Sequence, residues 1–397
     1  MRISTSAIHQ NALSAMLTQQ SQLAKTQNQV STGKRVLSPS DDPVAAVHII
    51  ELQRALQQST QYTKNAGAAG DRLSLEEQAL ADVGTVMQRV REQSLQANNG
   101  TVDPNSRKLI ATELRQRLDE LTNIANRRDS NGEYLFSGFS TSTQPFSQTS
   151  SGISYAGDQG SRLLQIGPSQ TINDSDSGFD VFMNIKEGNG TFVLAGAASN
   201  AGTGVLGASS VVDSTAWTPD TYTLTFTDAA GGYQITDSSA NVVSVGTYTN
   251  GSAIQFNGVK FEMSGMPAQN DTFTISSSGK EDIFTTLKGI INSLEGTTAS
   301  NDAQFNSNMS VALQQLDQID SHVLQVRAQV GTRLSEIDSV KDSLDQQQLD
   351  LKQSTSDLQD LDYTEAVTRM NQQLIGLQAA QSAYSKISQM SLFDYLR

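Results

Sequence analysis

Residues 31–46 read STGKRVLSPSDDPVAA, and this stretch separates two long segments that contain no proline. Proline is favoured at the first position of a helix, and the residue before a proline is driven to extended backbone angles. Asp42 and Pro43 fit this pattern, so we predict that Asp42 caps a helix of which Pro43 is the first residue. The alternative is that Asp41 and Asp42 form a catalytic or metal-binding pair. No histidine or further carboxylate clusters nearby to complete such a site.

The composition excludes several classes of partner and of chemistry. The 397 residues carry a net charge of −14, from 27 basic and 41 acidic residues, so we expect neither nucleic acid nor a membrane as partner. The absence of cysteine excludes disulfides, thiolate metal sites and cysteine nucleophiles. No segment approaches the roughly 20 apolar residues that span a bilayer, and the N-terminal residues do not form a standard secretory signal.

The chain has helix-forming outer zones and a middle zone in which 17 of the 23 aromatic residues lie, between 131 and 300. This division predicts an α+β fold, with a long antiparallel α-helical coiled-coil bundle built from both chain ends and a small all-β domain inserted in the middle. We expect terminal coiled-coil assembly segments at 1–40 plus 362–397. A helical-bundle domain with a β-hairpin should comprise 41–185 plus 276–361, and the outer all-β insertion should comprise 186–275.

Heptad patterns support the helical zones. Alternate steps of three and four residues from Met309 to Leu361 predict one helix over 303–361, with polar interruptions at Arg333, Gln347 and Ser354. Shorter runs cover 80–97 and a third helix 106–128. The terminal runs are Leu13, Met16, Gln20, Leu23, Gln27 and Val30, and Val367, Met370, Leu374, Leu377, Gln381 and Tyr384. Glutamine in both seams predicts that the chain ends are poorly ordered in the monomer and become helical on assembly.

The middle zone alternates with period two, as in TYTLTFT at 221–227, where Tyr222, Leu224 and Phe226 should share one face. Asn257-Gly258 between two short alternating runs predicts a hairpin. The runs ISYAG and SRLLQIG suggest a separate hairpin near 153–167.

No catalytic constellation emerges. The residues TGK at 32–34 lack the upstream glycine and the following Ser or Thr of a phosphate-binding loop. His9, His48 and His322 belong to no zinc-binding pair or nucleophile elbow. We therefore expect no enzyme, no catalytic residue, no cofactor and no metal.

Three segments resemble the flagellin superfamily of bacterial flagella. They are STGKRVLSPSDDPVAA, NNGTVDPNSRKLIATELRQRLDELTNIANRRDSNGEYLFSG and LDYTEAVTRMNQQLIGLQAAQSAYSKISQMSLFDYL. The stretch YLFSGFSTSTQPF, residues 134–146, and the ending SLFDYL are similar to the hook-associated branch, whose members include a protein that joins hook to filament.

The resemblance implies a structural role outside the cell, after export by the flagellar type III apparatus. The partners it implies are further copies in a ring-like layer, the preceding hook-associated protein, flagellin, and an export chaperone on the C-terminal segment. The residues expected to make assembly or chaperone contacts are Leu13, Met16, Leu23, Val30, Val367, Met370, Leu374, Leu377, Tyr384, Ile387, Leu392, Phe393 and Tyr395. Two alternatives are a flagellin filament subunit and a coiled-coil surface adhesin whose β domain binds glycans through Trp217, Tyr222, Tyr233 and Tyr248.

Overall fold

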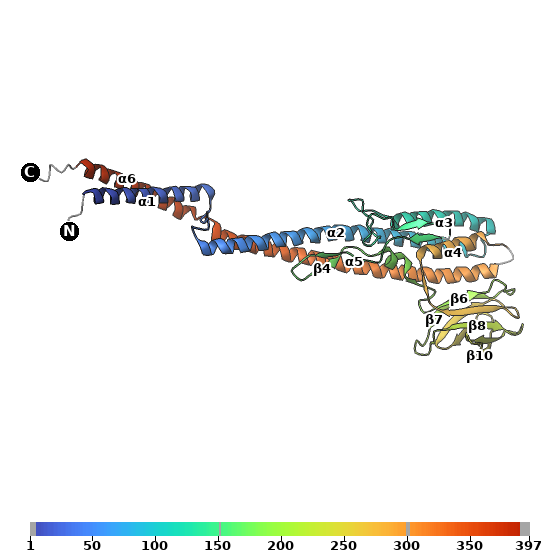
Figure 1. Cartoon of the computed structure of the whole chain (residues 1–397). Coiled ribbons are helices and arrows are strands. Elements are labelled where there is room, and N and C mark those ends of the chain that lie inside the picture. The colour runs from blue at the N-terminus through green and yellow to red at the C-terminus, as the bar shows by residue number, and fades with distance from the viewer. Residues whose placement is uncertain (1–4, 151, 299–301, 390–397) are drawn as a thin grey trace, which may run out of the picture. The chain divides into compact units, whose positions relative to one another are not determined.

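The computed structural model describes residues 5–150, 152–298 and 302–389. The chain divides into two compact units, which we call the terminal unit (residues 1–64 with 340–397) and the central unit (65–339). The α-helices of the described part are α1 (Thr5–Thr32), α2 (Pro43–Ala97), α3 (Pro104–Ala125), α4 (Ile283–Glu295), α5 (Asp302–Gln359) and α6 (Tyr363–Gln389) (Figure 1). Helices from both chain ends and antiparallel sheets between them confirm the predicted α+β class.

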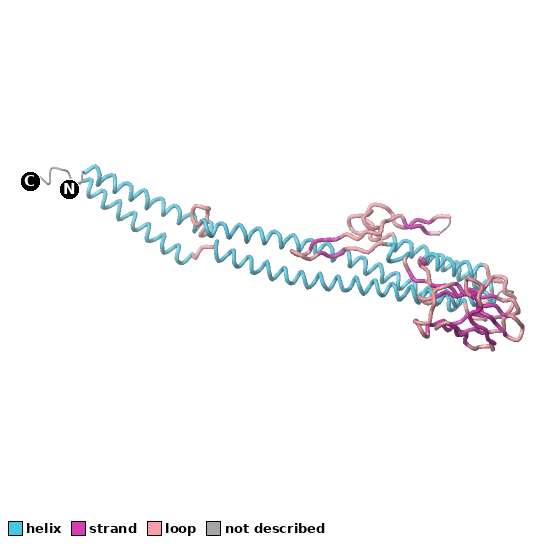
Figure 2. The backbone as a smooth tube through the Cα atoms, turned by 60° about the horizontal axis from the view of Figure 1, so that its bottom comes forward, coloured by secondary structure: helices cyan, strands magenta, loops and turns pink. Residues whose placement is uncertain are grey.

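In the terminal unit, α1 and α6 lie side by side along their length (Figures 1 and 2). The predicted seams are wrong at alternate positions. The buried or half-buried side chains are Ala12, Met16, Gln19, Leu23, Thr26 and Val30 on α1, and Ala366, Met370, Gln373, Leu377, Ala380 and Tyr384 on α6, with Leu374 also half-buried. A run of steps of three and four can start in two ways, and the larger Leu13 and Val367 were chosen where the smaller Ala12 and Ala366 face the partner helix.

The heptad prediction for the long helices holds over most of their length. The α2 positions Leu80, Val83, Met87, Val90, Ser94 and Ala97 are all buried, and the α5 seam is followed from Met309 to Leu344. Beyond Leu344 the prediction fails, because Gln347 and Ser354 are exposed whereas Gln348 and Thr355 are half-buried. Within the terminal unit, Gln348 donates through Nε2 to Thr63 Oγ1 at 2.9 Å, and this hydrogen bond accompanies the change of phase.

The strands of the middle zone form two sheets around one apolar core. The larger sheet has the order β10-β9-β8-β13-β6 and the smaller the order β11-β12-β7. The strands are β6 (Phe192–Gly196), β7 (Val205–Val211), β8 (Thr221–Phe226), β9 (Gly232–Thr236), β10 (Val242–Thr247), β11 (Ala253–Phe256), β12 (Val259–Ser264) and β13 (Thr272–Ser277). Tyr222, Leu224 and Phe226 are buried on one face, as predicted. The β11–β12 hairpin turns at Asn257 and Gly258, both at positive φ, as a two-residue turn of this kind requires.

The single hairpin predicted near 153–167 is wrong. The two runs are strands, but each pairs with another neighbour: β2 (Ile153–Tyr155) with β1 (Phe146–Gln148), and β3 (Leu163–Gln165) with β4 (Thr171–Asn173). A turn closes each pair, because the Thr149 N–H donates to the Gly152 carbonyl at 2.7 Å and the Ile166 N–H to the Gln170 carbonyl at 3.0 Å. Two short hairpins therefore stand where one was expected.

Polar side chains of α5 attach the two-sheet region to the helices of the central unit. The Leu206 N–H donates to Ser307 Oγ at 3.1 Å, and Gln314 Nε2 donates to the Gly207 carbonyl at 2.9 Å. Gln315 accepts from the Gly188 N–H at 2.6 Å and donates to the carbonyl of Lys186, which lies in β5 (Ile185–Lys186), at 3.1 Å. β5 pairs with β14 (Lys280–Glu281), where the chain returns, and α3 packs beside α4. The three-part domain division stays a prediction.

Candidate assembly surfaces

Asp41 and Asp42 make different contacts in the segment between α1 and α2. Asp42 Oδ1 accepts from the Ala45 N–H at 3.0 Å, which is the geometry of an N-cap, and Pro43 is the first residue of α2. This amide bond and Arg35, whose Nη1 lies 3.3 Å from Asp42 Oδ2, lower the pKa of Asp42. The second carboxylate of the pair is therefore occupied by backbone and by one arginine.

Asp41 closes the turn before the cap. Its Oδ2 accepts from the backbone N–H groups of Leu37 at 3.1 Å and Ser38 at 3.0 Å, and Lys25 Nζ lies 2.8 Å from Oδ1. The Lys25 ammonium and these amides lower the pKa of Asp41 to about 2. With both carboxylates engaged in this way, the pair serves as local structure in the segment that the sequence marked out.

The same segment is joined to the end of α5. The Arg35 N–H donates to the Gln359 carbonyl at 2.7 Å, and the Leu361 N–H donates to the Gly33 carbonyl at 2.9 Å. Gly33 has φ of +70°, and a Cβ there would lie 2.8 Å from the Tyr363 hydroxyl oxygen, so this position needs glycine. Leu358 packs against a small cluster formed by Val36, Ala45, Ala46 and Ile49. Residues 33–43 therefore join the N-terminal and C-terminal helices of the terminal unit.

The predicted assembly residues fall into three groups. Those in the α1–α6 pair are Met16, Leu23, Val30, Met370, Leu374, Leu377 and Tyr384, which are buried or half-buried. Leu13 and Val367 are exposed on the outside of the pair. Ile387 lies in α6, and nothing is described of its side chain, whereas Leu392, Phe393 and Tyr395 lie outside the described residues.

Sequence reasoning missed an apolar stripe at the start of α2. Val44, Val47 and Ile50 are exposed by 70%, 55% and 53%. They alternate with Ala45, Ala46 and Ile49, which are buried, so the first turns of α2 are apolar on two faces. A continuous apolar run, rather than a single stripe, is the sequence signal that identifies such a helix. Leu17 on α1 and Ile375 on α6 are exposed as well. Exposed apolar side chains grouped in this way indicate an interaction surface.

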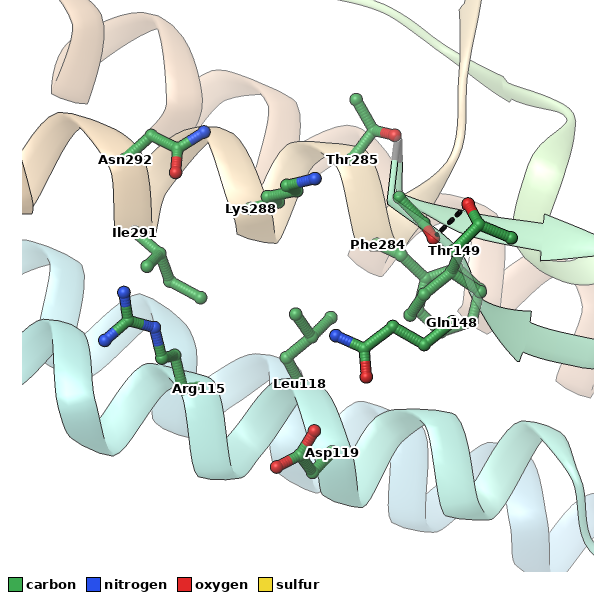
Figure 3. Close-up of a pocket in the computed structure, with 12 residues that line it drawn as sticks. Arg115, Leu118, Asp119, Gln148, Thr149, Phe284, Thr285, Lys288, Ile291 and Asn292 are labelled. Atoms are coloured by element: carbon green, nitrogen blue, oxygen red, sulfur yellow. Dashed lines mark hydrogen bonds between the residues drawn. The ribbon is translucent and has the colours of Figure 1, made fainter.

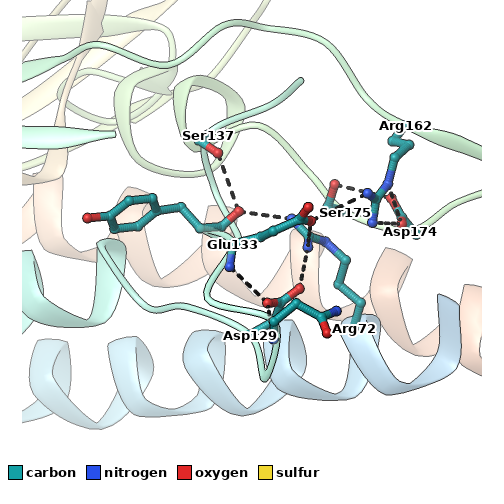
Figure 4. Close-up of polar contacts among 9 residues, drawn as sticks. Arg72, Asp129, Glu133, Ser137, Arg162, Asp174 and Ser175 are labelled. Carbon is teal, nitrogen blue, oxygen red and sulfur yellow. Dashed lines mark hydrogen bonds and ion pairs between the residues drawn. The ribbon is translucent and has the colours of Figure 1, made fainter. Parts of the chain in front are cut away.

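A buried polar cluster in the central unit holds two loops on α2 (Figure 4). Arg72 reaches Asp129 Oδ2 through Nη1 at 2.8 Å and the Tyr134 carbonyl through Nη2 at 2.9 Å, and Glu133 Oε2 lies 3.3 Å from Nη1. Arg162 Nη2 lies 2.6 Å from Asp174 Oδ2. Buried charges of this kind are tolerated only when paired and hydrogen-bonded, which is the arrangement here.

Next to this cluster, Glu76 is an acid that the sequence reasoning did not single out. Its side chain is buried, and Oε1 accepts from the Asp176 N–H at 3.3 Å. Burial raises the pKa of Glu76 well above its ordinary value, and the charge of Asp176 raises it further. Asp176 is paired with Arg333, which explains why an arginine interrupts the α5 heptads. The spacing of four residues between Arg72 and Glu76 on one helix was the available signal.

A pocket of about 380 Å³ opens between α3, α4 and the β1–β2 hairpin (Figure 3). Its apolar lining consists of Leu118, Ile153, Phe284 and Ile291, and Arg115 and Lys288 supply two cationic side chains. Asp119 also lines it. The lining offers apolar surface and charge for binding.

The remaining chemistry is sparse. Within 5–150, 152–298 and 302–389, no group of three or more His, Asp or Glu side chains could hold a metal ion. Among the helices that the structure describes, none has the length and apolarity required to cross a bilayer. His322 contacts the Asp180 carbonyl at 2.8 Å, and His48 lies 3.5 Å from Glu51. Tyr222 and Tyr248 are buried, and Trp217 and Tyr233 pack against the same core, so these aromatics do not form an exposed glycan platform.

Known proteins match this chain over most of its length. Models of the bacterial flagellin N-terminal and C-terminal helical regions match residues 3–141 and 313–396, and a D2-like domain model of flagellar hook-associated protein 1 matches 195–277. Flagellar hook-associated protein 3 of Escherichia coli (strain K12) is 28% identical over 398 residues, which covers 99% of each chain. The crystal structure of FlgL from Xanthomonas campestris is 34% identical with a TM-score of 0.73, and the match covers 77% of this chain and 99% of that one.

The chain belongs to the family of flagellar hook-associated protein 3, FlgL. A further FlgL structure, that of the flagellar junction protein from Legionella pneumophila, is 31% identical with a TM-score of 0.72. Its match covers 79% of this chain and all of that chain. The FlgL family membership accounts for the resemblance of the two helical ends to flagellin, since the flagellin models match those ends.

Proposed function

We propose that this FlgL-family chain is a structural subunit of the bacterial flagellum that joins the hook to the flagellin filament. The observation that supports this most strongly is the match to hook-associated protein 3 along 99% of both chains, together with the junction-protein structure that the whole fold resembles. Its work is to form contacts, and we assign it no enzymatic reaction.

In this proposal the subunits form a ring-like layer, with the preceding hook-associated protein below and flagellin above. The exposed apolar side chains of the terminal unit supply contact surface, because they have no cover within their own copy. On α1 and α6 these are Leu13, Leu17, Val367 and Ile375, and on α2 they are Val44, Val47 and Ile50. Burying a Val, Leu or Ile side chain contributes about 1.5–3 kcal/mol, so a few such contacts per neighbour favour assembly.

The chain reaches this position by export through the flagellar type III apparatus and functions outside the cell. An export chaperone covers the C-terminal segment, 362–397, beforehand. The α1–α6 pair supports this assignment, since its seam contains Gln19 and Gln373 and many of its side chains are only half-buried. Such a weakly sealed pair leaves apolar surface that needs cover before assembly.

Deletion of the gene tests the proposal. Cells without the protein should carry hooks without filaments and should release flagellin into the medium, and a copy of the full-length gene should restore the filaments. Normal filaments on the deletion strain would contradict the proposal. If the chain were instead the filament subunit, flagellin-sized material would be missing from both cells and medium.

A further inference from the structure

Phe139 is an aromatic side chain held in solvent on the surface of the central unit. It is 65% exposed, although large aromatic side chains usually contribute to the core. The loop that carries it is fixed by one carboxylate: Asp158 accepts from the N–H groups of Phe139 at 2.9 Å, Ser140 at 3.0 Å and Gly160 at 2.8 Å. These bonds lower the pKa of Asp158, so the carboxylate is charged at neutral pH.

Glycines shape the support under the ring. Gly138 has φ of +70°, which favours glycine, and a Cβ on Gly160 would overlap the ring of Phe139. The Tyr155 hydroxyl lies 3.1 Å from the Phe136 carbonyl and 2.6 Å from that of Asp158, which ties the loop to the β1–β2 hairpin. The ring therefore lies against its own Gly160 on a pre-organised loop. A rigid exposed aromatic loses little conformational entropy when a partner covers it, which is typical of a binding anchor.

The pocket between α3 and α4 is suited to receive such a ring. Leu118, Ile153, Phe284 and Ile291 give it an apolar lining, and its volume of about 380 Å³ exceeds that of a phenyl ring (Figure 3). Arg115 and Lys288 lie at the same opening. Their charge complements the Asp158 carboxylate beside Phe139, whereas most of this chain, with its net charge of −14, repels another copy.

We propose that Phe139 of one copy inserts into the α3–α4 pocket of a neighbouring copy in the assembled layer. A ring is built from heterologous contacts, in which two different surfaces of one chain fit each other, and the exposed ring and the pocket are two such surfaces. The contact rests on the proposed function, because it identifies the copy-to-copy surfaces of the layer. The occupant is a second copy, since the chain's own Phe139 is held on Gly160 by its loop.

Cysteine cross-linking tests this contact, and the chain offers a clean background because it contains no cysteine. One full-length copy carries Phe139→Cys, and a second carries Asn292→Cys at the edge of the pocket. Both are expressed in a strain that lacks the gene, and isolated flagella are treated with a short bismaleimide. A cross-linked dimer should form when both variants are present and not with either alone.

A matched control replaces Phe139→Cys by Leu163→Cys, another exposed apolar residue of the central unit, and should give no dimer. Equal dimer in the control, or no dimer in flagella that contain both variants, would overturn the contact while leaving the junction role intact. If neither variant is found at the junction and filaments still form, the junction role itself fails. In addition, Phe139→Ala should increase filament loss under shear with an unchanged monomer melting temperature, and Phe139→Leu should restore retention. Filament loss unchanged by Phe139→Ala would also contradict the contact.

Discussion

Gln19 of α1 lies opposite α6 with its Nε2 3.4 Å from the Gln373 carbonyl, and Gly376 provides the space for it. A Cβ on Gly376 would lie 3.2 Å from Gln19 Nε2, so the helices approach closely at this point. A polar pair in a helical seam weakens the seam and fixes its register. In a junction subunit, a terminal pair of limited stability suits a segment that must exchange partners during assembly.

This register can be tested by two adjacent substitutions. Gln19→Leu should stabilise the α1–α6 pair, by about 0.8 kcal/mol for each methylene group that gains burial. Gln20→Leu is the matched control, because Gln20 is exposed and should give no gain. Limited proteolysis measures the difference as slower trimming of the first 32 residues, those that end with α1. Faster protection in Gln20→Leu than in Gln19→Leu would mean that the seam follows the originally predicted positions.

The cap on α2 gives a second prediction. Asp42→Ala removes the acceptor for the Ala45 N–H and should lower the melting temperature, whereas Asp42→Asn and Asp42→Ser retain an acceptor and should lower it much less. Because the folded-state pKa of Asp42 is lowered, its ionised form contributes stability above the unfolded-state pKa, and this contribution is lost as the pH falls. Thermal unfolding of the four proteins measures the order. Loss of filaments in Asp42→Asn at an unchanged melting temperature would indicate a charge-specific role instead.

Glu76 predicts a pH dependence of the opposite sign. The folded-state pKa of this buried acid is raised, so its contribution is complete below the unfolded-state value of about 4.5 and is lost as the pH rises toward the folded-state pKa. Glu76→Gln stays neutral, so it should match the parent protein at low pH and be more stable than the parent near neutral pH. Urea unfolding across this range measures the crossing. Glu336→Gln on the exposed face of α5 is the control. A Glu76→Gln protein that is less stable than the parent at neutral pH would refute this assignment.

The sheet region gives a structural prediction. Its entry and exit strands, β5 and β14, pair through Lys186 and Lys280, so the two ends lie together. Excision of 187–279 with a short Gly/Ser bridge should therefore leave a folded protein with its helices intact. Circular dichroism at helical wavelengths and a cooperative thermal transition measure this outcome. Loss of the helical signal would show that the bonds from Ser307, Gln314 and Gln315 support α5 as well as the sheets.

The sequence predicted the parts of this fold in which residue size and polarity point to one answer. The α5 seam from Met309 to Leu344 is apolar except at Arg333, so its phase could be read directly. Beyond it, Gln347 and Gln348 are the same residue type, and only the contact of Gln348 with Thr63 separates them. On α1, Ala12 and Leu13 compete for one position, and close approach of the helices favours the smaller side chain.

The assembly surfaces were predicted in part. The exposed Leu13 and Val367 were named from the sequence, but through seam positions that they do not occupy. The α2 stripe from Val44 to Ile50 was missed because the buried and exposed faces there are both apolar. Phe139 lay within a quoted motif, yet its exposure depends on the hydrogen bonds to Asp158, a residue 19 positions away, which no local pattern contains.

The position of the protein along the flagellum tests the junction role most directly. An epitope tag placed in the β9–β10 turn, at residues 237–241, allows immunogold labelling of flagella isolated from a complemented deletion strain. The account predicts gold at one narrow band where the hook meets the filament, and a parent strain without the tag should give none. Gold spread along the whole filament would identify a filament subunit, and flagella without gold at the junction would contradict the account.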